Sequence, residues 1–211
     1  MRILIIGATR GIGREAVKEA LRRGHEVRAF SRSARDMAPA DRLEPFAGDA
    51  TRAEDVAAAL EGMEAVILAI GVPKSPGFVI NRVRLFSKAT EVLCKTMPVA
   101  GVSRLVAVTG FGAGSSRRAL GPFLELPFRA VFGRAYDDKD RQEHIIEECG
   151  LDWTIFRPGL LTSGPASGRA RALVEPESWH AGLVSRADVA RYCVEAVETG
   201  AWMHQAPVLV R

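Results

Sequence analysis

Short apolar runs alternate with amphipathic helical segments along most of the chain. The first run, Ile-Leu-Ile-Ile at residues 3–6, ends at a glycine, as strands buried on both faces of a parallel sheet often do. Similar runs predict further strands at residues 25–30, 43–47, 65–70, 104–109, 152–156 and 207–210. Helical patterns predict helices at residues 14–23, 51–60, 78–95, 137–149 and 185–198. This alternation predicts an α/β fold, a single Rossmann-type doubly wound parallel sheet with helices on both faces.

Length and capping signals refine this picture. A chain of 211 residues that is 47% hydrophobic can bury one full core, so we expect a single domain over residues 1–211. Thr51 and Glu54 have the spacing of a capping box, and Ser185 with Asp188 is expected to cap the last helix. Residues 111–136 and 160–184 are expected to form a small substrate-side region. The first of these is apolar and basic, which fits either a flap or partner contact, including docking at a membrane surface, or helices interrupted at Pro122 and Pro127.

Composition argues against several classes of partner. The net charge of +4 is modest and its basic residues are spread, so nucleic-acid binding is not expected. No run of 18 apolar residues predicts an integral membrane segment, and because a strand is expected from the second residue we expect no signal peptide. Three cysteines without a CxxC pair predict reduced thiols in a cytoplasmic protein and no metal site. We expect a monomer or a homodimer.

A glycine turn follows the first strand and opens the first helix. Gly7, Gly11 and Gly13 would permit a tight bend, close approach of a pyrophosphate, and packing of helix on strand. The free N–H groups at the start of the helix would then face the phosphates, where the helix dipole is positive. A turn with a purely structural role is the alternative, but the strand-turn-helix context favours a dinucleotide site.

The end of the second strand indicates which dinucleotide binds. An NAD site usually has an acidic residue there to hold the ribose 2′-hydroxyl, whereas this chain has Ser31-Arg32-Ser33. Arg32, helped by Arg10 inside the glycine turn and by Arg35, is suited to a 2′-phosphate. NADP(H) is therefore favoured over NAD(H), although solvated surface arginines would give the same pattern.

Four stretches carry a family resemblance: GATRGIG, GDATRAEDV, AIGVP and KDRQEHIIEECGLDWTIFRPG. They resemble the atypical short-chain dehydrogenase/reductases, in the small NAD(P)H-binding branch that includes biliverdin-IXβ/flavin reductase and the NmrA-like proteins. The likeness covers most of the chain and is weakest over residues 111–136 and 160–184. It implies pyrophosphate contacts from Gly7, Thr9, Arg10 and Ile12, a 2′-phosphate contact from Arg32, adenine contacts from Asp49 and Ala50, and ribose contacts from Ile70 and Gly71. Thr109 and Gly110 would lie beside the nicotinamide, with Pro158, Gly159 and Leu160 behind it.

The catalytic residues are less clearly indicated. The Tyr-x-x-x-Lys pair of the conventional branch is missing, because Asp140 stands four residues after Tyr136 and Lys139 falls one residue early. Residues three apart can share a helical face, but Asp137 is expected to cap the helix, which would leave Tyr136 outside it as a packing or lid residue. Lys139 is expected to touch cofactor or substrate, or else to form a surface ion pair with Glu143. Thr109 could offer a hydroxyl, or only a hydrogen bond at the end of its strand.

These observations predict an NADPH-dependent oxidoreductase that transfers hydride to a small conjugated acceptor. A carbonyl acceptor needs a positioned acid, whereas a flavin, a quinone or a linear tetrapyrrole spreads the incoming charge. The main alternative is a non-catalytic NADP(H)-binding redox sensor or regulator, as in NmrA-like proteins. A sugar-nucleotide epimerase or dehydratase is less favoured, since only about 50 residues follow Gly159, and these enzymes usually carry a larger substrate domain.

Overall fold

The computed structural model describes residues 1–71 and 84–211, and the side chains of these residues except 120, 122–132 and 134. An eight-stranded sheet lies at its centre, in the order β3-β2-β1-β4-β5-β6-β10-β8. All neighbouring strands in this sheet are parallel except β10 and β8. Its strands are β1 (Arg2–Ile6), β2 (Glu26–Ser31), β3 (Leu43–Ala47), β4 (Ala65–Leu68), β5 (Arg104–Val108), β6 (Asp152–Pro158), β8 (Arg171–Leu173) and β10 (Val208–Val210). A separate small parallel sheet pairs β7 (Leu160–Thr162) with β9 (Leu183–Ser185).

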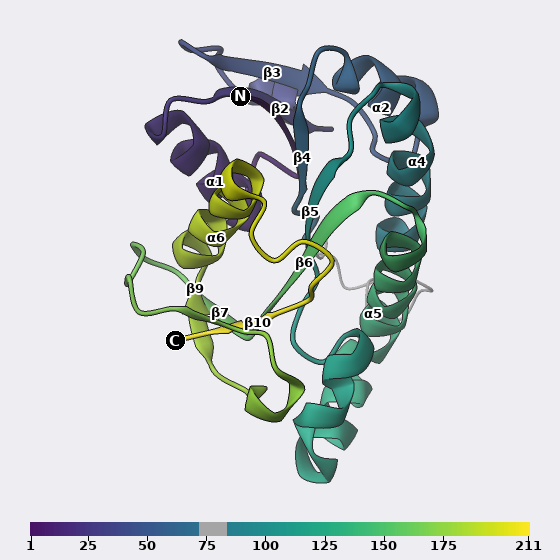
Figure 1. The fold of residues 1–211 in the computed structure, drawn as a ribbon, viewed down its shortest axis with the longest axis vertical. Coiled ribbons are helices and arrows are strands. Elements are labelled where there is room, and N and C mark those ends of the chain that lie inside the picture. The colour runs from purple at the N-terminus through teal and green to yellow at the C-terminus, as the bar shows by residue number, and fades with distance from the viewer. Residues whose placement is uncertain (72–83) are drawn as a thin grey trace.

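Helices cover both faces of the sheet (Figure 1). One face carries α1 (Gly11–Arg22) and α6 (Arg186–Thr199), and the other carries α2 (Ala53–Leu60), α4 (Leu85–Val99) and α5 (Pro122–Glu148). Three short 3-10 turns complete the described part, η1 (Ala34–Asp36), η2 (Gly114–Leu120) and η3 (Pro176–Ser178). The expected doubly wound α/β architecture is confirmed. No described helix is both long and apolar enough to cross a membrane.

The apolar run of β1 explains why the sheet is covered on both sides. Ile3 and Ile5 pack into the cluster that includes α1 and α6, whereas Leu4 and Ile6 pack into the cluster that includes α2 and α4. Because successive side chains of a strand point to opposite faces, four consecutive apolar residues require a helix layer on each face. The continuous apolar run at residues 3–6 therefore indicates a central strand that is buried on both faces.

Several element boundaries differ from the sequence predictions. The helix expected from residue 137 begins fifteen residues earlier, at Pro122, and continues through Pro127. The helix expected over residues 78–95 is described from Leu85 to Val99, and residues 78–83 lie outside the described residues. The first helix starts at Gly11 instead of residue 14, and the strand expected to end at residue 70 ends at Leu68. The strand expected over residues 152–156 continues through Pro158.

The two predicted helix caps have different outcomes. Ser185 caps α6, because its hydroxyl accepts a hydrogen bond from the Asp188 N–H. The capping box of Thr51 and Glu54 was wrong: α2 begins at Ala53, and the Thr51 hydroxyl donates to Asp49 Oδ1 at 2.8 Å. Asp49 competes for the same hydroxyl from two residues away, which is a common local alternative to a helix cap.

The order of the strands determines where a ligand can bind. From β1 the chain builds outward through β2 and β3 on one side, and through β4, β5 and β6 on the other. The direction reverses between β1 and β4, and in such sheets the ligand site lies outside the carboxyl ends of the strands at this switch. The glycine turn after β1 lies at that position.

Candidate functional site

The glycine turn combines tight packing with one open position. A Cβ on Gly7 would lie 2.5 Å from the Ala69 carbonyl oxygen, and a Cβ on Gly13 would lie 2.2 Å from the Gly7 carbonyl oxygen. These two glycines therefore allow β1, β4 and α1 to pack closely. At Gly11, where φ is +59°, a Cβ would meet nothing within 4 Å. The surface above the start of α1 is open there, and no described side chain caps this helix end at Arg10. The turn thus fits a pyrophosphate.

Hydroxyl groups gather at the carboxyl end of β2, beside the glycine turn. The side-chain oxygens of Thr9, Ser31 and Ser33 lie 3.1 Å from one another in all three pairs. Arg10 and Arg32 are exposed at the same end of the sheet, one in the glycine turn and one directly after β2. Hydroxyls and guanidinium groups are strong donors to phosphate oxygens, so this cluster fits a 2′-phosphate.

Asp49 and Ala50 follow β3 at the same edge. The Asp49 carboxylate accepts hydrogen bonds from the Thr51 N–H at 2.9 Å and the Thr51 hydroxyl at 2.8 Å. These bonds, and then the charge of Arg32, lower the pKa of Asp49 below its ordinary value. Asp49 is thus held ionised within the electrostatic reach of Arg32. Ala50 is half-buried and packs against the apolar cluster under α2.

Ile70 and Gly71 end the described segment that follows β4. Ile70 packs against the same apolar cluster as Ala50. Gly71 is exposed, and a Cβ there would meet nothing within 4 Å. The structure therefore places both residues at the ligand edge of the sheet, beside the topological switch.

Lys139 on α5 is fastened to the carboxyl end of β5. Its Nζ donates to the Thr109 carbonyl oxygen at 2.6 Å and lies 4.7 Å from the centre of the Phe86 ring. The alternative of a surface ion pair with Glu143 was wrong, because Lys139 is only 6% exposed. Burial lowers the pKa of Lys139 to about 8, against the opposing effects of Glu143 and Asp138. The ammonium group thus retains most of its charge at neutral pH in a site with little water.

The Thr109 hydroxyl is also occupied. It donates to Glu143 Oε1 at 2.5 Å, and Thr109 itself is buried. A hydroxyl has one proton, so this bond leaves only the oxygen lone pairs of Thr109 for a ligand. Thr109 thus serves as the point where β5 meets both Lys139 and Glu143.

Tyr136 lies within α5, one turn before Lys139. The expectation that Asp137 caps this helix and excludes Tyr136 was wrong, because α5 begins at Pro122. The tyrosine hydroxyl lies over Gly110, where a Cβ would come within 2.6 Å of it. Burial, followed by the charges of Glu143 and Asp140, raises the pKa of Tyr136 to about 12. The structure therefore brings Tyr136, Lys139 and Thr109 to one strand end despite the missing Tyr-x-x-x-Lys spacing.

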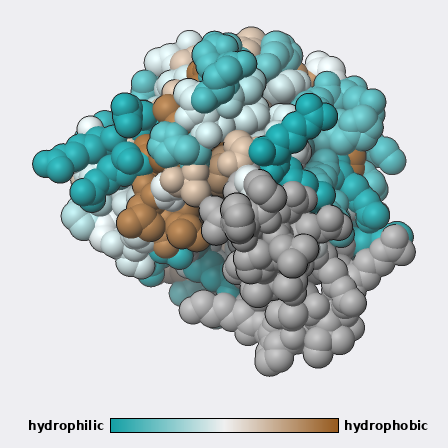
Figure 2. Space-filling model, turned by 90° about the horizontal axis from the view of Figure 1, so that it is seen from below, coloured by the Kyte–Doolittle hydropathy of each residue, from teal (hydrophilic) through white to brown (hydrophobic). Residues whose placement is uncertain are grey.

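Pro158, Gly159 and Leu160 form the next part of this edge. The Pro158 carbonyl oxygen accepts from the Phe111 N–H at 2.8 Å, which joins the chain after β5 to the end of β6. A Cβ on Gly159 would lie 2.3 Å from the Gly182 carbonyl oxygen, so the two backbones touch. Leu160 is 70% exposed, and it pairs in β7–β9 with Leu183, which is 56% exposed. Figure 2 shows an apolar patch on the face that contains the carboxyl ends of the strands.

Comparisons with known proteins agree with this geometry. A family model described as NAD(P)H-binding matches residues 7–199. The chain belongs to this NAD(P)H-binding family. ChuY, an anaerobillin reductase from Escherichia coli O157:H7, superposes with a TM-score of 0.83 at 29% identity, covering 100% of this chain and 97% of ChuY. The predicted resemblance to NAD(P)H-binding short-chain dehydrogenase/reductases is confirmed at the level of the family.

The curated relatives of the chain carry more varied names. The chain is 28% identical to the uncharacterized sugar epimerase YhfK of Bacillus subtilis over 208 residues, which cover 94% of this chain and 88% of YhfK. It is 25% identical to the photosystem II assembly factor Ycf39 of Synechocystis over 207 residues, 94% of this chain and 59% of that protein. Membership of the NAD(P)H-binding family thus supports the cofactor class and leaves the reaction to be argued from the site.

Sequence reasoning missed a buried ion pair behind the strand ends. Arg157 Nη2 donates to Glu143 Oε2 at 2.7 Å, and both side chains are 2% exposed. Arg157 also donates to Ser115 Oγ at 3.1 Å and to the Ala206 carbonyl oxygen at 3.2 Å. The four-residue spacing of Lys139 and Glu143 placed them on one face of α5, and Arg157 was visible only as part of an Arg-Pro-Gly stretch. Nothing in the sequence indicated that this face of α5 meets the end of β6.

Proposed function

We propose that the protein is an NADPH-dependent oxidoreductase that reduces a small conjugated acceptor such as a flavin, a quinone or a linear tetrapyrrole. One observation carries the proposal: the Tyr136 hydroxyl and the Lys139 ammonium group both reach the carboxyl end of β5, beside Gly110 and Thr109. The similarity of the whole chain to an anaerobillin reductase supports a reductase.

The cofactor would lie along the edge formed by the strand ends. Gly7, Gly11, Gly13, Thr9, Arg10 and Ile12 would hold the pyrophosphate, with the α1 dipole favouring its negative charge. Ser31 and Arg32 would hold the 2′-phosphate, and this cluster of hydroxyl and guanidinium donors supports NADP(H) over NAD(H). The remaining contacts proposed are those of Asp49, Ala50, Ile70, Gly71, Thr109, Gly110, Lys139, Pro158, Gly159 and Leu160.

When bound, the nicotinamide supplies the hydride, and the protein supplies position and charge. Lys139 places a positive charge at the end of β5, where it stabilises negative charge that develops on an acceptor. Tyr136 keeps its proton at neutral pH because its pKa is raised to about 12, so its hydroxyl can donate a hydrogen bond there. The Thr109 hydroxyl donates its hydrogen bond to Glu143, and we assign Thr109 the role of holding β5 in place rather than of donating a proton to the acceptor.

A conjugated acceptor fits these groups better than a simple carbonyl. The Tyr136 phenol is a weak acid in this setting, and Lys139 is committed to the Thr109 carbonyl oxygen. An acceptor that spreads its charge needs less proton transfer from the protein than an alkoxide does. The exposed leucines of β7–β9 beside the site also suit an apolar, planar molecule.

The test is oxidation of NADPH by the purified protein, followed by absorbance with FMN, a quinone, a linear tetrapyrrole and an aldehyde. Affinity for NADPH is measured separately by calorimetry, so that binding and turnover are not confused. We expect saturable, protein-dependent oxidation with a conjugated acceptor and little with the aldehyde. Tight NADPH binding without oxidation by any acceptor would instead support a redox sensor or regulator.

A further inference from the structure

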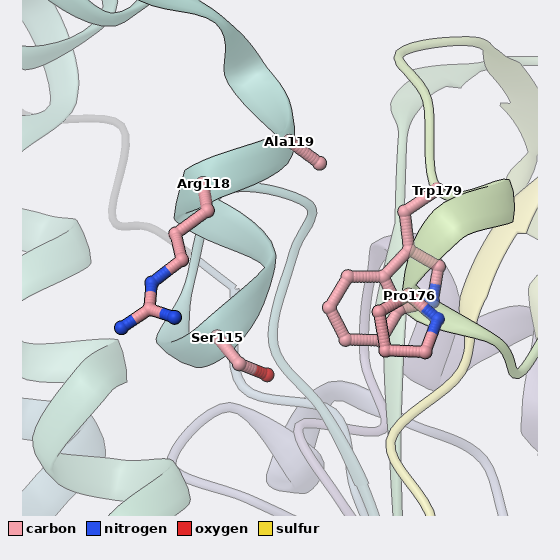
Figure 3. A pocket seen from close by; sticks show the side chains of 5 residues that line it. All are labelled: Ser115, Arg118, Ala119, Pro176 and Trp179. Atoms are coloured by element: carbon pink, nitrogen blue, oxygen red, sulfur yellow. The ribbon is translucent and has the colours of Figure 1, made fainter.

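A cavity of about 330 Å³ opens between η2 and η3, apart from the residues assigned to the cofactor. Ser115, Arg118 and Ala119 line one wall, and Pro176 and Trp179 line the opposite wall (Figure 3). Ligand pockets are typically about 300–1,000 Å³, so this cavity can take one or two fused rings and not a whole large acceptor.

The Trp179 ring is held in place before any ligand arrives. Its Nε1 donates to the Leu173 carbonyl oxygen at 2.9 Å, and the Arg157 guanidinium carbon lies 5.3 Å from the ring centre. Arg157 is itself fixed by its ion pair with Glu143. A preoriented indole loses little conformational entropy when a planar group packs on it, which favours stacking of an aromatic ring.

The polar groups of the cavity favour an anion. Ser115 Oγ accepts a hydrogen bond from Arg157 Nη1, so its own proton is available to an acceptor atom. Arg118 is exposed and belongs to none of the ion pairs of the described residues, whereas its neighbour Arg117 is paired with Asp140 and Asp137. In Figure 3 the Arg118 side chain leaves η2 on the side away from Trp179 and reaches down to about the level of Ser115, so its guanidinium lies at the rim of the cavity. A carboxylate near this wall would meet a guanidinium and a hydroxyl donor.

A chain of contacts joins the cavity to the end of β5. Arg157 contacts both Ser115 and Trp179, Arg157 pairs with Glu143, and Glu143 accepts from the Thr109 hydroxyl. One buried network thus connects the wall of the cavity with the end of β5.

We propose that the η2–η3 cavity is a subsite for a planar ring bearing a carboxylate, which stacks on Trp179 and pairs with Arg118. As a subsite for the acceptor it rests on the proposed reductase function. It selects acceptors that carry an acidic group at one end of an apolar, conjugated body. Trp179 and Arg118 are then determinants of specificity rather than catalytic residues.

The first test measures binding alone and needs no turnover. Calorimetry compares 2-naphthoate, its uncharged analogue 2-naphthamide, and acetate, with the protein saturated with NADP⁺ so that the probes cannot enter the cofactor site. We expect 2-naphthoate to bind about tenfold more tightly than the amide, and acetate to bind undetectably, because both the ring and the charge contribute. Arg118→Gln should make the two naphthyl probes equal in affinity, and Trp179→Leu should weaken both.

The matched control is Arg141→Gln, which removes an exposed arginine of α5 outside the cavity lining and should leave 2-naphthoate binding unchanged. Equal affinity of the wild type for acid and amide, or full retention of 2-naphthoate binding in both cavity variants, would overturn the proposal.

A second measurement separates the subsite from the reductase function. With an acceptor that is turned over, Arg118→Gln should raise KM for the carboxylate form about tenfold, leave kcat unchanged, and leave KM for the matching amide unchanged. If the acceptor is turned over and its KM is the same in the wild type and in Arg118→Gln, the proposed subsite is wrong and the proposed reductase function is retained. Selective 2-naphthoate binding without any NADPH oxidation contradicts the reductase and leaves an anion-binding cavity.

Discussion

Lys139 and Thr109 are joined by a 2.6 Å hydrogen bond from the ammonium group to the backbone carbonyl oxygen. This bond ties the middle of α5 to the carboxyl end of β5, where the sheet meets the proposed site. The lysine is buried beside the Phe86 ring, and it is the positive charge that the proposal places closest to the reacting end.

The lowered pKa of Lys139 predicts that activity depends on pH. Its pKa of about 8 means that the ammonium group loses its proton as the pH rises through that value. We expect kcat/KM for the acceptor to fall above about pH 8 in the wild type, and Lys139→Met to be slower and flat over the same range. Profiles from pH 6 to pH 10, about two units either side of this pKa, check this. A wild-type profile that stays level through pH 10 would assign the role to a group other than Lys139.

The same lysine predicts a dependence of stability on pH. Its pKa in the folded state is lower than its ordinary value of 10.5, so between about 8 and 10.5 the unfolded chain binds more protons than the folded one. The free energy of unfolding then rises with pH in this window, compared with Lys139→Met. Urea unfolding of both proteins at pH 7.5, 9 and 10, values chosen to span roughly this window, measures the difference. The free energy of unfolding of the wild type minus that of Lys139→Met should therefore rise with pH. A fall of this value as pH rises would contradict a buried lysine with a lowered pKa.

Gly110 and Tyr136 form a pair whose coupling can be measured. A Cβ on Gly110 would lie 2.6 Å from the Tyr136 hydroxyl oxygen but 3.4 Å from the ring carbon that carries it. Gly110→Ala should therefore destabilise the protein by about 1–3 kcal/mol and lower turnover. In a Tyr136→Phe background the same change should cost much less, because the clashing atom is gone. Equal costs in the two backgrounds would show that the hydroxyl does not lie over Gly110.

Glu143 and Arg157 are expected to be strongly coupled. Glu143→Gln leaves the Arg157 charge buried without its partner, which should cost about 3–5 kcal/mol of stability. Replacing both residues, as Glu143→Gln with Arg157→Met, should cost less than the sum of the single changes. The matched control is His144→Gln, since this neighbour on α5 is exposed and its side chain contacts only Glu148 among the described ion pairs. Additive losses in the double variant would mean that the ion pair contributes no coupling.

Much of the fold could be predicted because its signals are local. Some features can be recognised from a few neighbouring residues alone. They are the four consecutive apolar residues of β1, the glycines Gly7 and Gly13, and the cap at Ser185. The strands β7, β8 and β9 could not be predicted, because three residues show no periodicity and each of these strands contains a polar residue, whereas the equally short β10 is wholly apolar. The start of α5 was misplaced because Asp137 has the chemistry of a cap. Pro122 stands in the first turn of the helix, and Pro127 lies inside it without ending it.

One part of the candidate site could also be predicted from the sequence, and another part could not. Its cofactor side follows from the glycine turn and from the absence of an acid after β2, both of which are contiguous in sequence. The cluster of Lys139, Glu143, Arg157 and Ser115 is assembled from three separate elements, so its contacts depend on how α5, β6 and η2 pack. The sequence pattern indicates each of these residues separately, and it does not predict which of them are in contact.

Arg32 tests the choice of cofactor. Arg32→Glu should lower the ratio of NADPH to NADH affinity by about tenfold to a hundredfold, because it removes a charge-assisted bond to the 2′-phosphate and adds repulsion. Arg141→Glu, which makes the same charge change on α5, should leave the ratio unchanged. Calorimetric titration of each variant with both cofactors measures it. An unchanged ratio in Arg32→Glu would place the 2′-phosphate elsewhere or make the site indifferent to it.

Consumption of NADPH at this site can be followed in a single-turnover experiment. Protein in excess is mixed with NADPH and then with a conjugated acceptor, and the nicotinamide absorbance is followed in the wild type and in the Tyr136→Phe, Lys139→Met double variant. We expect complete loss of the absorbance in one phase for the wild type and a much slower phase for the variant, with NADPH still bound by both. Bound NADPH whose absorbance stays constant in the wild type with every acceptor of the panel would contradict it.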